Sequence, residues 1–404
     1  MTFAQLALVG LVALLGPLLA YPARWHLPVV LGELVAGVAI GRTGFRWVDA
    51  SDPTFSFIAQ VGFALVMFVA GTHVPVRDPA LRPALKSGLV RALSIAVAAA
   101  VLGIVIARVS GVPHAALYAV LLASSSAALI LPVVDGLGLG GPQVIGMLPQ
   151  VALADSLCIV ALPLAIDPHH ALRAGGGAAA VIAAAVVAWL ALRELERRGI
   201  RRNVHRISER RLFAVELRVQ LVILAALAAL AVATHVSIML AGFAFGLGVT
   251  AIGEPRRLAK QLFALTEGFL SPVFFVWLGA ELDLRTFGSH PGMIALGLVL
   301  GLGACLTHLV GRAFGQPVSL GLLASAQLGV PVAAATVGSQ LGVLRPGESA
   351  ALILGALITI AAAVVGGGMA ARAGMFAEAV PAPGTEHVAP GNPSAPPTDP
   401  QAST

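Results

Sequence analysis

The chain has 404 residues, of which 58% are hydrophobic and only 11% are charged. Soluble domains carry about 25% charged residues, so a chain this apolar lacks the surface of a water-soluble protein. The formal net charge of +6 does not indicate nucleic-acid binding, because the basic residues lie in loops between apolar runs. Composition therefore predicts an all-α polytopic membrane protein, since the continuous apolar runs lack the alternation of a membrane β-barrel.

Apolar windows of about 20 residues predict thirteen membrane-spanning helices. These spans cover residues 3–21, 27–43, 54–72, 86–108, 113–133, 143–166, 175–193, 214–234, 236–252, 262–281, 291–313, 317–342 and 348–371. The membrane domain is thus expected to occupy residues 1–372. Residues 373–404 are rich in Pro, Ala, Ser and Thr, and this composition predicts a disordered tail.

Lys and Arg are distributed unequally between the loops at the two ends of these spans. Six of the 25 fall on the side of the N-terminus and nineteen on the other side, nine of them between Arg193 and Arg218. By the positive-inside rule, the N-terminus faces outwards and the C-terminus is cytoplasmic, as in a multi-pass protein of a bacterial inner membrane. The basic loop 194–213 is read as a topology anchor on anionic lipid, with binding of a regulatory nucleotide or partner as the alternative.

An internal repeat relates the two halves of the chain at offsets of 209, 208 and 201 residues. The matched positions are Gly37 with Gly246, Gly71 with Gly279, and Leu121–Ser124 with Leu322–Ser325. The repeats would span residues 1–167 and 214–372, joined by a linker helix within 168–213. Because six helices and one linker precede the second copy, that copy begins on the opposite face. The pattern predicts the inverted repeats of many secondary transporters.

The fifth and twelfth spans each carry a proline inside an apolar run. Pro132 follows Ser124–Ser126, and Pro331 follows Gln327–Gly329. Proline removes a helix hydrogen bond, so we expect two discontinuous, crossing helices whose free carbonyls face an ion. The alternative is a simple kink in which serine hydroxyls bond their own helix. On the first interpretation, the candidate ligands are Ser124, Ser125 and Ser126, whereas Gln327, Pro132 and Pro331 are candidates for supporting roles.

Asp155 lies in the middle of the sixth span, where an ionisable side chain is a functional hypothesis by default. Burial in a low dielectric disfavours its anion, so the carboxyl group can hold a proton or a small cation but not both. Hard cations favour several oxygen ligands, and the serines and freed carbonyls of the broken helices can supply them. The alternative is a structural partner for a buried donor.

Three further ionisable residues in the spans are candidates for supporting roles. Glu33 is expected at an interface or beside an arginine. Glu267 is expected one turn into its helix, where a carboxylate favours the helix N-terminus. His308 is read as a satisfied core histidine, with a proton relay as the alternative. Cys158 and Cys305 lie far apart and predict neither a disulfide nor a metal site.

The order of these motifs resembles the cation:proton antiporter superfamily, the sodium/proton exchanger group, and within it the monovalent cation:proton antiporter-2 type. The resemblance covers roughly residues 5–372. The segments that carry it are Leu27–Gly37, Phe68–Gly71, Ser124–Val133, Ser271–Gly279 and Leu322–Glu348.

The resemblance implies a dimer domain and a mobile core domain, with the ion site where the broken helices cross. It also implies an elevator-like shift of the core and a homodimer. The transported partners would be a monovalent cation and H⁺, and no cofactor is expected.

Three positions depart from the family pattern. The usual Asp-Asp or Asn-Asp pair is Ala154-Asp155, and a glutamate often found two residues after the glycine at position 71 is His73. The lysine of electrogenic members is missing, because the eleventh span contains no Lys. With one buried carboxylate and no such lysine, we expect electroneutral exchange of one cation for one proton.

The leading functional hypothesis is an antiporter that exchanges Na⁺ or K⁺ for protons, with Asp155 as the shared site. A sodium-coupled symporter of a small organic anion stays open, because the polar partner at the Ala154 position is missing. An enzyme is not expected: Asp155 is the single mid-membrane aspartate, no Gly-x-Ser-x-Gly surrounds Ser124–Ser126, and no HExxH occurs.

Overall fold

The computed structural model describes residues 1–21, 29–72, 84–168, 171–199, 214–234, 236–252 and 256–376. His73, most of the basic loop 194–213 and the proline-rich tail beyond residue 376 lie outside the described residues. Within the described part, nearly all of the membrane domain is helical, and each of the thirteen predicted spans corresponds to a helix or to consecutive helices. Ten helical stretches in it are long and apolar enough to cross a membrane, and three more are shorter. The all-α prediction is confirmed.

In the first half, two of the predicted spans each consist of two consecutive helices. Its elements are α1 (Phe3–Ala13), α2 (Leu15–Ala20), α3 (Val29–Ile40), α4 (Pro53–Thr72), α5 (Leu85–Ser110), α6 (Ala115–Ala123), α7 (Ala127–Gly136), α8 (Gly141–Ile166) and α9 (Ala171–Arg197). The first span consists of α1 and α2, and the fifth consists of α6 and α7. In position, α9 corresponds to the predicted linker helix.

The second half repeats this order with extra short elements. Its elements are α11 (Val215–Ala233), α12 (Ile238–Ile252), α13 (Arg256–Leu265), the π-helix η4 (Thr266–Leu270), α14 (Ser271–Glu281), α15 (Leu284–Gly288), α16 (Pro291–Leu309), the 3₁₀-helix η5 (Val310–Phe314), α17 (Val318–Ala324), α18 (Gly329–Gln340) and α19 (Glu348–Arg372). The twelfth span is split into α17 and α18, as the fifth is split into α6 and α7.

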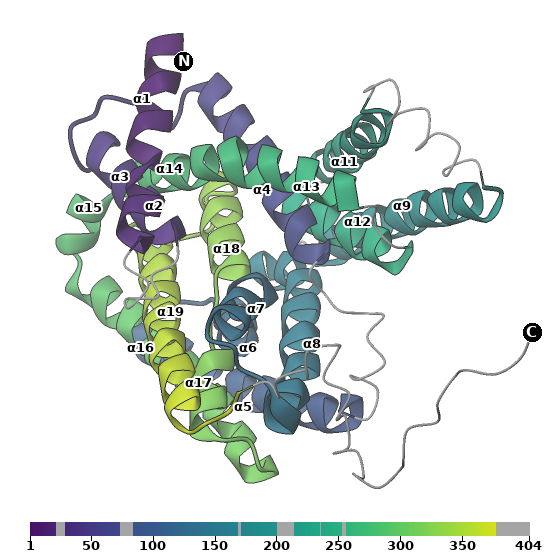
Figure 1. Cartoon of the computed structure of the whole chain (residues 1–404). Coiled ribbons are helices and arrows are strands. Elements are labelled where there is room, and N and C mark those ends of the chain that lie inside the picture. The colour runs from purple at the N-terminus through teal and green to yellow at the C-terminus, as the bar shows by residue number, and fades with distance from the viewer. Residues whose placement is uncertain are drawn as a thin grey trace, which may run out of the picture.

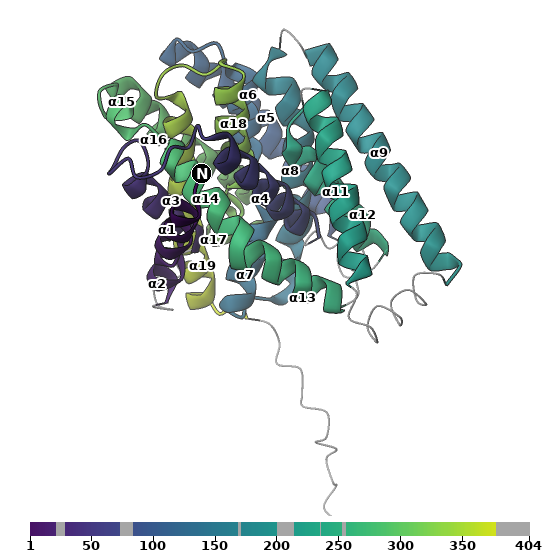
Figure 2. The ribbon, with the colours of Figure 1, turned by 90° about the horizontal axis from the view of Figure 1, so that it is seen from above.

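The helices form two bundles, each built from both halves of the chain (Figure 1). In the scaffold bundle, α1–α4 pack with α11–α14; in the core bundle, α5–α8 pack with α16–α19. Helix α9 runs beside α11 and α12 along one edge of the molecule (Figure 2). The core therefore contains the split fifth and twelfth spans and α8.

Small residues allow the scaffold helices to approach closely. Gly71 of α4 faces Gly246 of α12, and a Cβ atom added at Gly71 would lie 3.1 Å from the Cα of Gly246 and 2.9 Å from the backbone nitrogen of Leu247. Lipid tails are as apolar as leucine, so such helices associate through close backbone packing rather than through hydrophobic burial alone. A side chain at either glycine would separate α4 from α12.

Buried Glu348 joins the two halves of the core at the start of α19. Its Oε1 accepts a hydrogen bond from Tyr118 Oη at 2.8 Å and lies 2.7 Å from His114 Nδ1. Its Oε2 accepts from the backbone N–H of Arg345 at 2.8 Å. Because a buried carboxylate is stabilised only when its oxygens have partners, these contacts fix the start of α6 against the start of α19.

Candidate functional site

The fifth and twelfth spans are interrupted at segments that contain polar residues rather than at their prolines. The first interruption is Ser124–Ser126, between α6 and α7, and the second is Ser325–Leu328, between α17 and α18. Pro132 lies inside α7 and Pro331 in the first turn of α18, where a missing N–H costs little. The expectation of breaks at the prolines is wrong, whereas the expectation of two discontinuous helices is confirmed.

Asp155 lies on α8 with 4% of its surface exposed, and its carboxylate points to the first interruption. Its Oδ2 accepts a hydrogen bond from the backbone N–H of Ala127 at 3.0 Å. Ala127 is the first residue of α7, so the carboxylate caps a helix N-terminus, where the peptide dipoles favour negative charge. The interruption therefore creates the donor that holds Asp155.

The three serines of the first interruption are all buried but have different contacts. Ser124 Oγ donates to the carbonyl oxygen of Leu121 at 2.9 Å, within its own half-helix. Ser125 Oγ donates to the carbonyl oxygen of Ala324, the last residue of α17. The carbonyl oxygen of Ser126 accepts the first helical hydrogen bonds of α7. Ser125 thus links the two broken helices directly.

Gln327 forms a second link between the interruptions. Its Nε2 donates to the carbonyl oxygen of Ser124 at 3.2 Å, and its backbone N–H donates to Thr359 Oγ1 at 3.2 Å. The predicted ligands Asp155, Ser124 and Ser125 and the predicted supporting residue Gln327 are therefore brought to the same helix crossing. The notion of an independent kink in each span does not describe this arrangement.

His308 of α16 is completely buried beside the same crossing. Its Nδ1 lies 2.9 Å from the carbonyl oxygen of Ala304 one turn earlier, and its Nε2 lies 3.2 Å from Ser125 Oγ. A carbonyl oxygen only accepts, so Nδ1 carries the hydrogen of the first bond. Nε2 of the neutral ring is then an acceptor, and it competes with the carbonyl oxygen of Ala324 for the single hydroxyl hydrogen of Ser125. This arrangement agrees with a core histidine that packs against Ser125.

Glu33 and Glu267 belong to the scaffold rather than to the crossing. Glu33 of α3 is buried against Gly16 of α2, and its Oε2 has no hydrogen-bond partner. Glu267 is the second residue of the π-helix η4, and α13 precedes it from Arg256 onwards. The expectation that Glu267 lies one turn into its helix is therefore wrong, because the helical stretch begins earlier than the apolar window indicated.

Three further hydroxyl groups stabilise the two interruptions, and no sequence pattern had indicated them. Thr307 Oγ1 of α16 donates to the carbonyl oxygen of Leu122 at 2.8 Å, in the last turn of α6. Thr359 of α19 accepts from Gln327, and Ser325 Oγ donates to Leu322 at 2.7 Å. Polar side chains at membrane depth are the signal that could have found them; the sequence search considered mainly ionisable groups.

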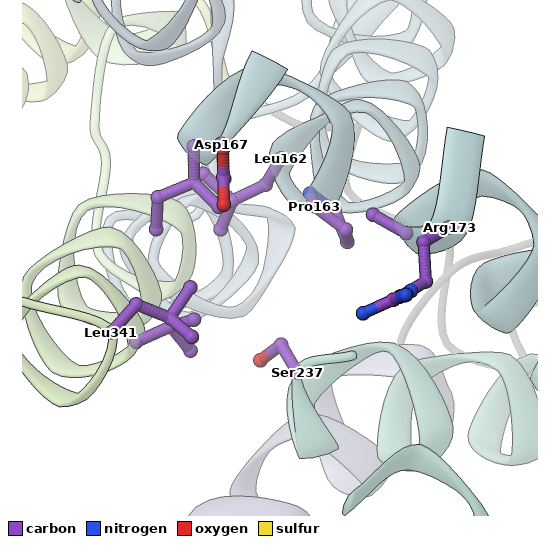
Figure 3. A pocket seen from close by; sticks show the side chains of 9 residues that line it. Leu162, Pro163, Asp167, Arg173, Ser237 and Leu341 are labelled. Atoms are coloured by element: carbon purple, nitrogen blue, oxygen red, sulfur yellow. The ribbon is translucent and has the colours of Figure 1, made fainter. Parts of the chain in front are cut away.

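A cavity of about 240 Å³ lies between the core and its surroundings, near the ends of α8 and α18 (Figure 3). A neighbouring cavity of about 310 Å³ shares Ser237, Val337 and Leu341 with it. Leu162 lines the first cavity and follows Asp155 by seven residues, which places it two turns along the same face of α8, at a rise of about 10 Å. The first cavity therefore borders the face of α8 that carries Asp155, two turns further along the helix.

The crossing combines one carboxylate with several oxygen acceptors of half-helix ends. The C-termini of α6 and α17 present carbonyl groups, whose partial negative charge favours a cation. Hydroxyls already occupy one lone pair on Leu122 and Ala324 oxygens, and each carbonyl keeps a second lone pair. Such an oxygen-rich, single-carboxylate site suits a proton or a small hard cation.

A family model described as "Sodium/hydrogen exchanger, transmembrane" matches residues 10–371. The chain is 23% identical over 377 residues to the putative Na⁺/H⁺ antiporter YjbQ of Bacillus subtilis, covering 88% of this chain. It spans 61% of the length of that relative. It is 24% identical over 337 residues to the probable Na⁺/H⁺ antiporter 3 of Methanocaldococcus jannaschii, covering 80% of this chain and 84% of the relative.

Among solved structures, the fold is similar to the sodium proton antiporter MjNhaP1 from Methanocaldococcus jannaschii at pH 8, with a TM-score of 0.61. The sequence identity is 20%, and the alignment covers 91% of this chain and 96% of that chain. At this identity the likeness concerns the fold alone.

Proposed function

Because the chain belongs to the sodium/hydrogen exchanger family, we propose that it is a secondary active transporter that exchanges Na⁺ or K⁺ for protons across the bilayer. The observation that carries the proposal is Asp155, buried at the crossing of two interrupted helices and held by the Ala127 N–H. The printed activities of the relatives, which are Na⁺/H⁺ antiporters, support the same exchange.

Asp155 is proposed as the shared site for the proton and the cation. In one state its carboxyl group is protonated and neutral, which lowers the cost of burial. In the other state the carboxylate neutralises the cation, and oxygens of Ser124, Ser125 and the half-helix ends replace part of its hydration shell. Since one carboxylate cannot hold both ligands, each binding event releases the other ion.

Alternating access is proposed to come from movement of the core bundle against the scaffold bundle. The cavities near the ends of α8 and α18 lie between core and scaffold residues, such as Val337 and Val236, and we propose that they belong to a path that leads to Asp155 from one side. A shift of the core along the scaffold would close this approach and open one from the other side, as inverted-repeat transporters require.

The orientation and the assembly are also proposals. The excess of Lys and Arg on the C-terminal side supports a cytoplasmic C-terminus and an outward-facing N-terminus in a bacterial inner membrane. In that orientation, the cavities near the ends of α8 and α18 would lie on the outward-facing side. The resemblance to the antiporter superfamily supports a homodimer, and a cross-linking experiment in native membranes tests it.

The proposed exchange is tested with purified protein in proteoliposomes that contain a pH-sensitive dye. Addition of Na⁺, K⁺ or Li⁺ should drive proton movement in the wild type, and Asp155→Asn should abolish it. Asp135→Asn provides the matched control, because Asp135 is an exposed aspartate on α7. Full exchange by Asp155→Asn would remove Asp155 from the mechanism, and the absence of exchange by the wild type with all three cations would contradict the proposed function.

A sodium-coupled symporter of a small organic anion is the second candidate. The observation that favours it is Ala154, which is buried where the family usually places a polar residue beside the aspartate. A Na⁺ gradient that drives uptake of an organic acid without proton movement would support this candidate over exchange.

A further inference from the structure

The two core halves correspond at a constant spacing after their interruptions. Leu137 and Gly138 directly follow α7, and Leu341 and Gly342 directly follow α18. Each residue of the second pair lies 204 positions after its counterpart in the first pair. Gly138 and Gly342 have φ values of 62° and 65°, a left-handed conformation that glycine adopts without strain. The N–H of Leu139 donates to Val134 at 2.9 Å, and that of Val343, also 204 positions later, donates to Gly338 at 3.1 Å.

This correspondence continues through the next helix of each half. Pro142 lies at the start of α8, and Pro346, again 204 positions later, lies just before α19. The same spacing pairs Asp155 with Thr359. Thr359 therefore occupies in the second half the position that the buried carboxylate occupies in the first.

The contacts of the two side chains agree with this pairing. Asp155 Oδ2 accepts the N–H of Ala127, at the end of the first interruption, and Thr359 Oγ1 accepts the N–H of Gln327, within the second. Both are buried, and Thr359 has none of its surface exposed. Each side chain thus supplies the oxygen that fixes the backbone of the broken helix preceding its own helix.

Thr359 holds its acceptor oxygen in one orientation. Its Oγ1 donates to the carbonyl oxygen of Ala356 at 2.7 Å, three residues earlier in α19. A β-branched side chain has few rotamers in a helix, and threonine selects among them through such a bond. The donated hydrogen leaves the oxygen lone pairs directed away from α19, where Gln327 N–H occupies one of them.

We propose that Thr359 is a positioning residue of the cation site, the uncharged counterpart of Asp155 in the second half of the core. It fixes Gln327, whose side-chain amide then engages the carbonyl oxygen of Ser124, so Thr359 sets how the two interruptions face the ion. This inference rests on the proposed exchange function. The hydroxyl supplies an acceptor without adding a second negative charge, so the site keeps the charge of a single carboxylate.

The test measures the KM and kcat for Na⁺, K⁺ and Li⁺ in proteoliposomes. Thr359→Val keeps the shape but leaves the buried N–H of Gln327 unpaired, and should raise the KM for Na⁺ about tenfold with a smaller change in kcat. It should also change the preference among the three cations. Thr359→Ser keeps the hydroxyl and should restore the wild-type KM and preference.

Thr234→Val is the matched control. Thr234 lies at the end of α11 in the scaffold, and its hydroxyl donates to the carbonyl oxygen of Leu230 in its own helix. This variant should keep the wild-type KM and cation preference, because it removes the same kind of bond at a distance from the crossing.

Wild-type KM and cation preference in Thr359→Val would overturn the inference while leaving the proposed exchange intact. If Thr359→Val does not fold, Thr359→Cys, with a poorer acceptor of similar size, replaces it and is judged by the same two results. If the wild type shows no exchange, the proposed function fails. Stabilisation of the detergent-solubilised protein by Na⁺ then decides the inference: a smaller Tm shift in the valine or cysteine variant supports it, and an equal shift overturns it.

Discussion

Gly37 of α3 crosses Gly279 of α14 so closely that a Cβ atom added at Gly37 would lie 2.9 Å from the Cα of Gly279. The other scaffold crossing, between Gly71 and Gly246, has the same character. The internal repeat pairs Gly37 with Gly246 and Gly71 with Gly279. Exchanging the two halves therefore converts one crossing into the other, which is the geometry expected of a pseudo-two-fold axis between inverted repeats.

The Gly37 crossing makes a prediction about stability. Gly37→Ala should lower the free energy of unfolding by about 1–3 kcal/mol, because overpacking forces α3 away from the backbone of α14. Thermal unfolding in detergent provides the measurement. The control is Gly10→Ala, since a Cβ atom at Gly10 meets no atom within 4 Å. Equal melting temperatures for the two variants would contradict the close crossing.

Removal of the Ser125 hydroxyl should weaken the link between the broken helices. Ser125→Ala removes the hydroxyl that donates to the buried carbonyl oxygen of Ala324 and that lies against Nε2 of His308. Leaving such buried groups unsatisfied costs about 1–3 kcal/mol, so we expect exchange at subsaturating Na⁺ to fall about tenfold or more. Ser87→Ala, at an exposed hydroxyl on α5, should leave exchange unchanged. A Ser125→Ala protein with wild-type exchange would contradict the role of this contact.

The cluster around Glu348 should stabilise the core independently of transport. Glu348→Gln keeps one acceptor oxygen, but its NH₂ group takes the other position and cannot accept there, so the cluster loses either the Arg345 bond or those of Tyr118 and His114. We expect the free energy of unfolding to fall by about 1–3 kcal/mol. Tyr118→Phe removes one of these donors and should cost less. Thermal unfolding of both proteins distinguishes the two losses, and a larger loss for Tyr118→Phe would contradict this view of the cluster.

Exchange should be insensitive to the membrane potential. The loaded site carries the same charge whether Asp155 holds a proton or a monovalent cation, so a one-for-one cycle moves no net charge. If one charge moved per cycle, 100 mV would contribute about 2.3 kcal/mol. The rate is measured at imposed potentials set by a thiocyanate gradient, since K⁺ is itself a candidate substrate. A rate that depends on voltage would reject the one-for-one stoichiometry.

Hydropathy was sufficient to place the helices because membrane-spanning segments must be both long and apolar. The same requirement makes a buried carboxylate such as Asp155 conspicuous, and the sequence therefore predicted its proximity to the broken helices. Glu267 was misplaced because η4 and α13 extend the helix beyond the apolar window. The first residues of α13 are mostly polar or charged, although they are helical. Hydropathy alone therefore does not locate the start of this helix.

The exact interruptions and the hydroxyl contacts depended on packing. Pro132 and Pro331 drew attention to the right spans, but the chain leaves the helical conformation earlier, where Ser125 and Gln327 gain partners on the opposite broken helix. Thr359 lies in an apolar stretch of α19 and resembles any helix-bonded threonine in the sequence. Its relation to Gln327 appears only when residues 32 positions apart are brought together.

The hydrogen bonds described here each remain inside one bundle. Thr250 bonds Thr72 within the scaffold, whereas Ser125 and Gln327 bond their partners within the core. At the cavities, the two bundles face each other through apolar side chains such as Val236 and Val337 and through the polar Gln60, Ser237 and Gln340. A displacement of the core would therefore exchange contacts between the bundles while the bonds within each bundle stay intact. The energetic barrier to that displacement would then come chiefly from transient exposure of apolar surface, so it should respond to the packing of the surrounding lipid.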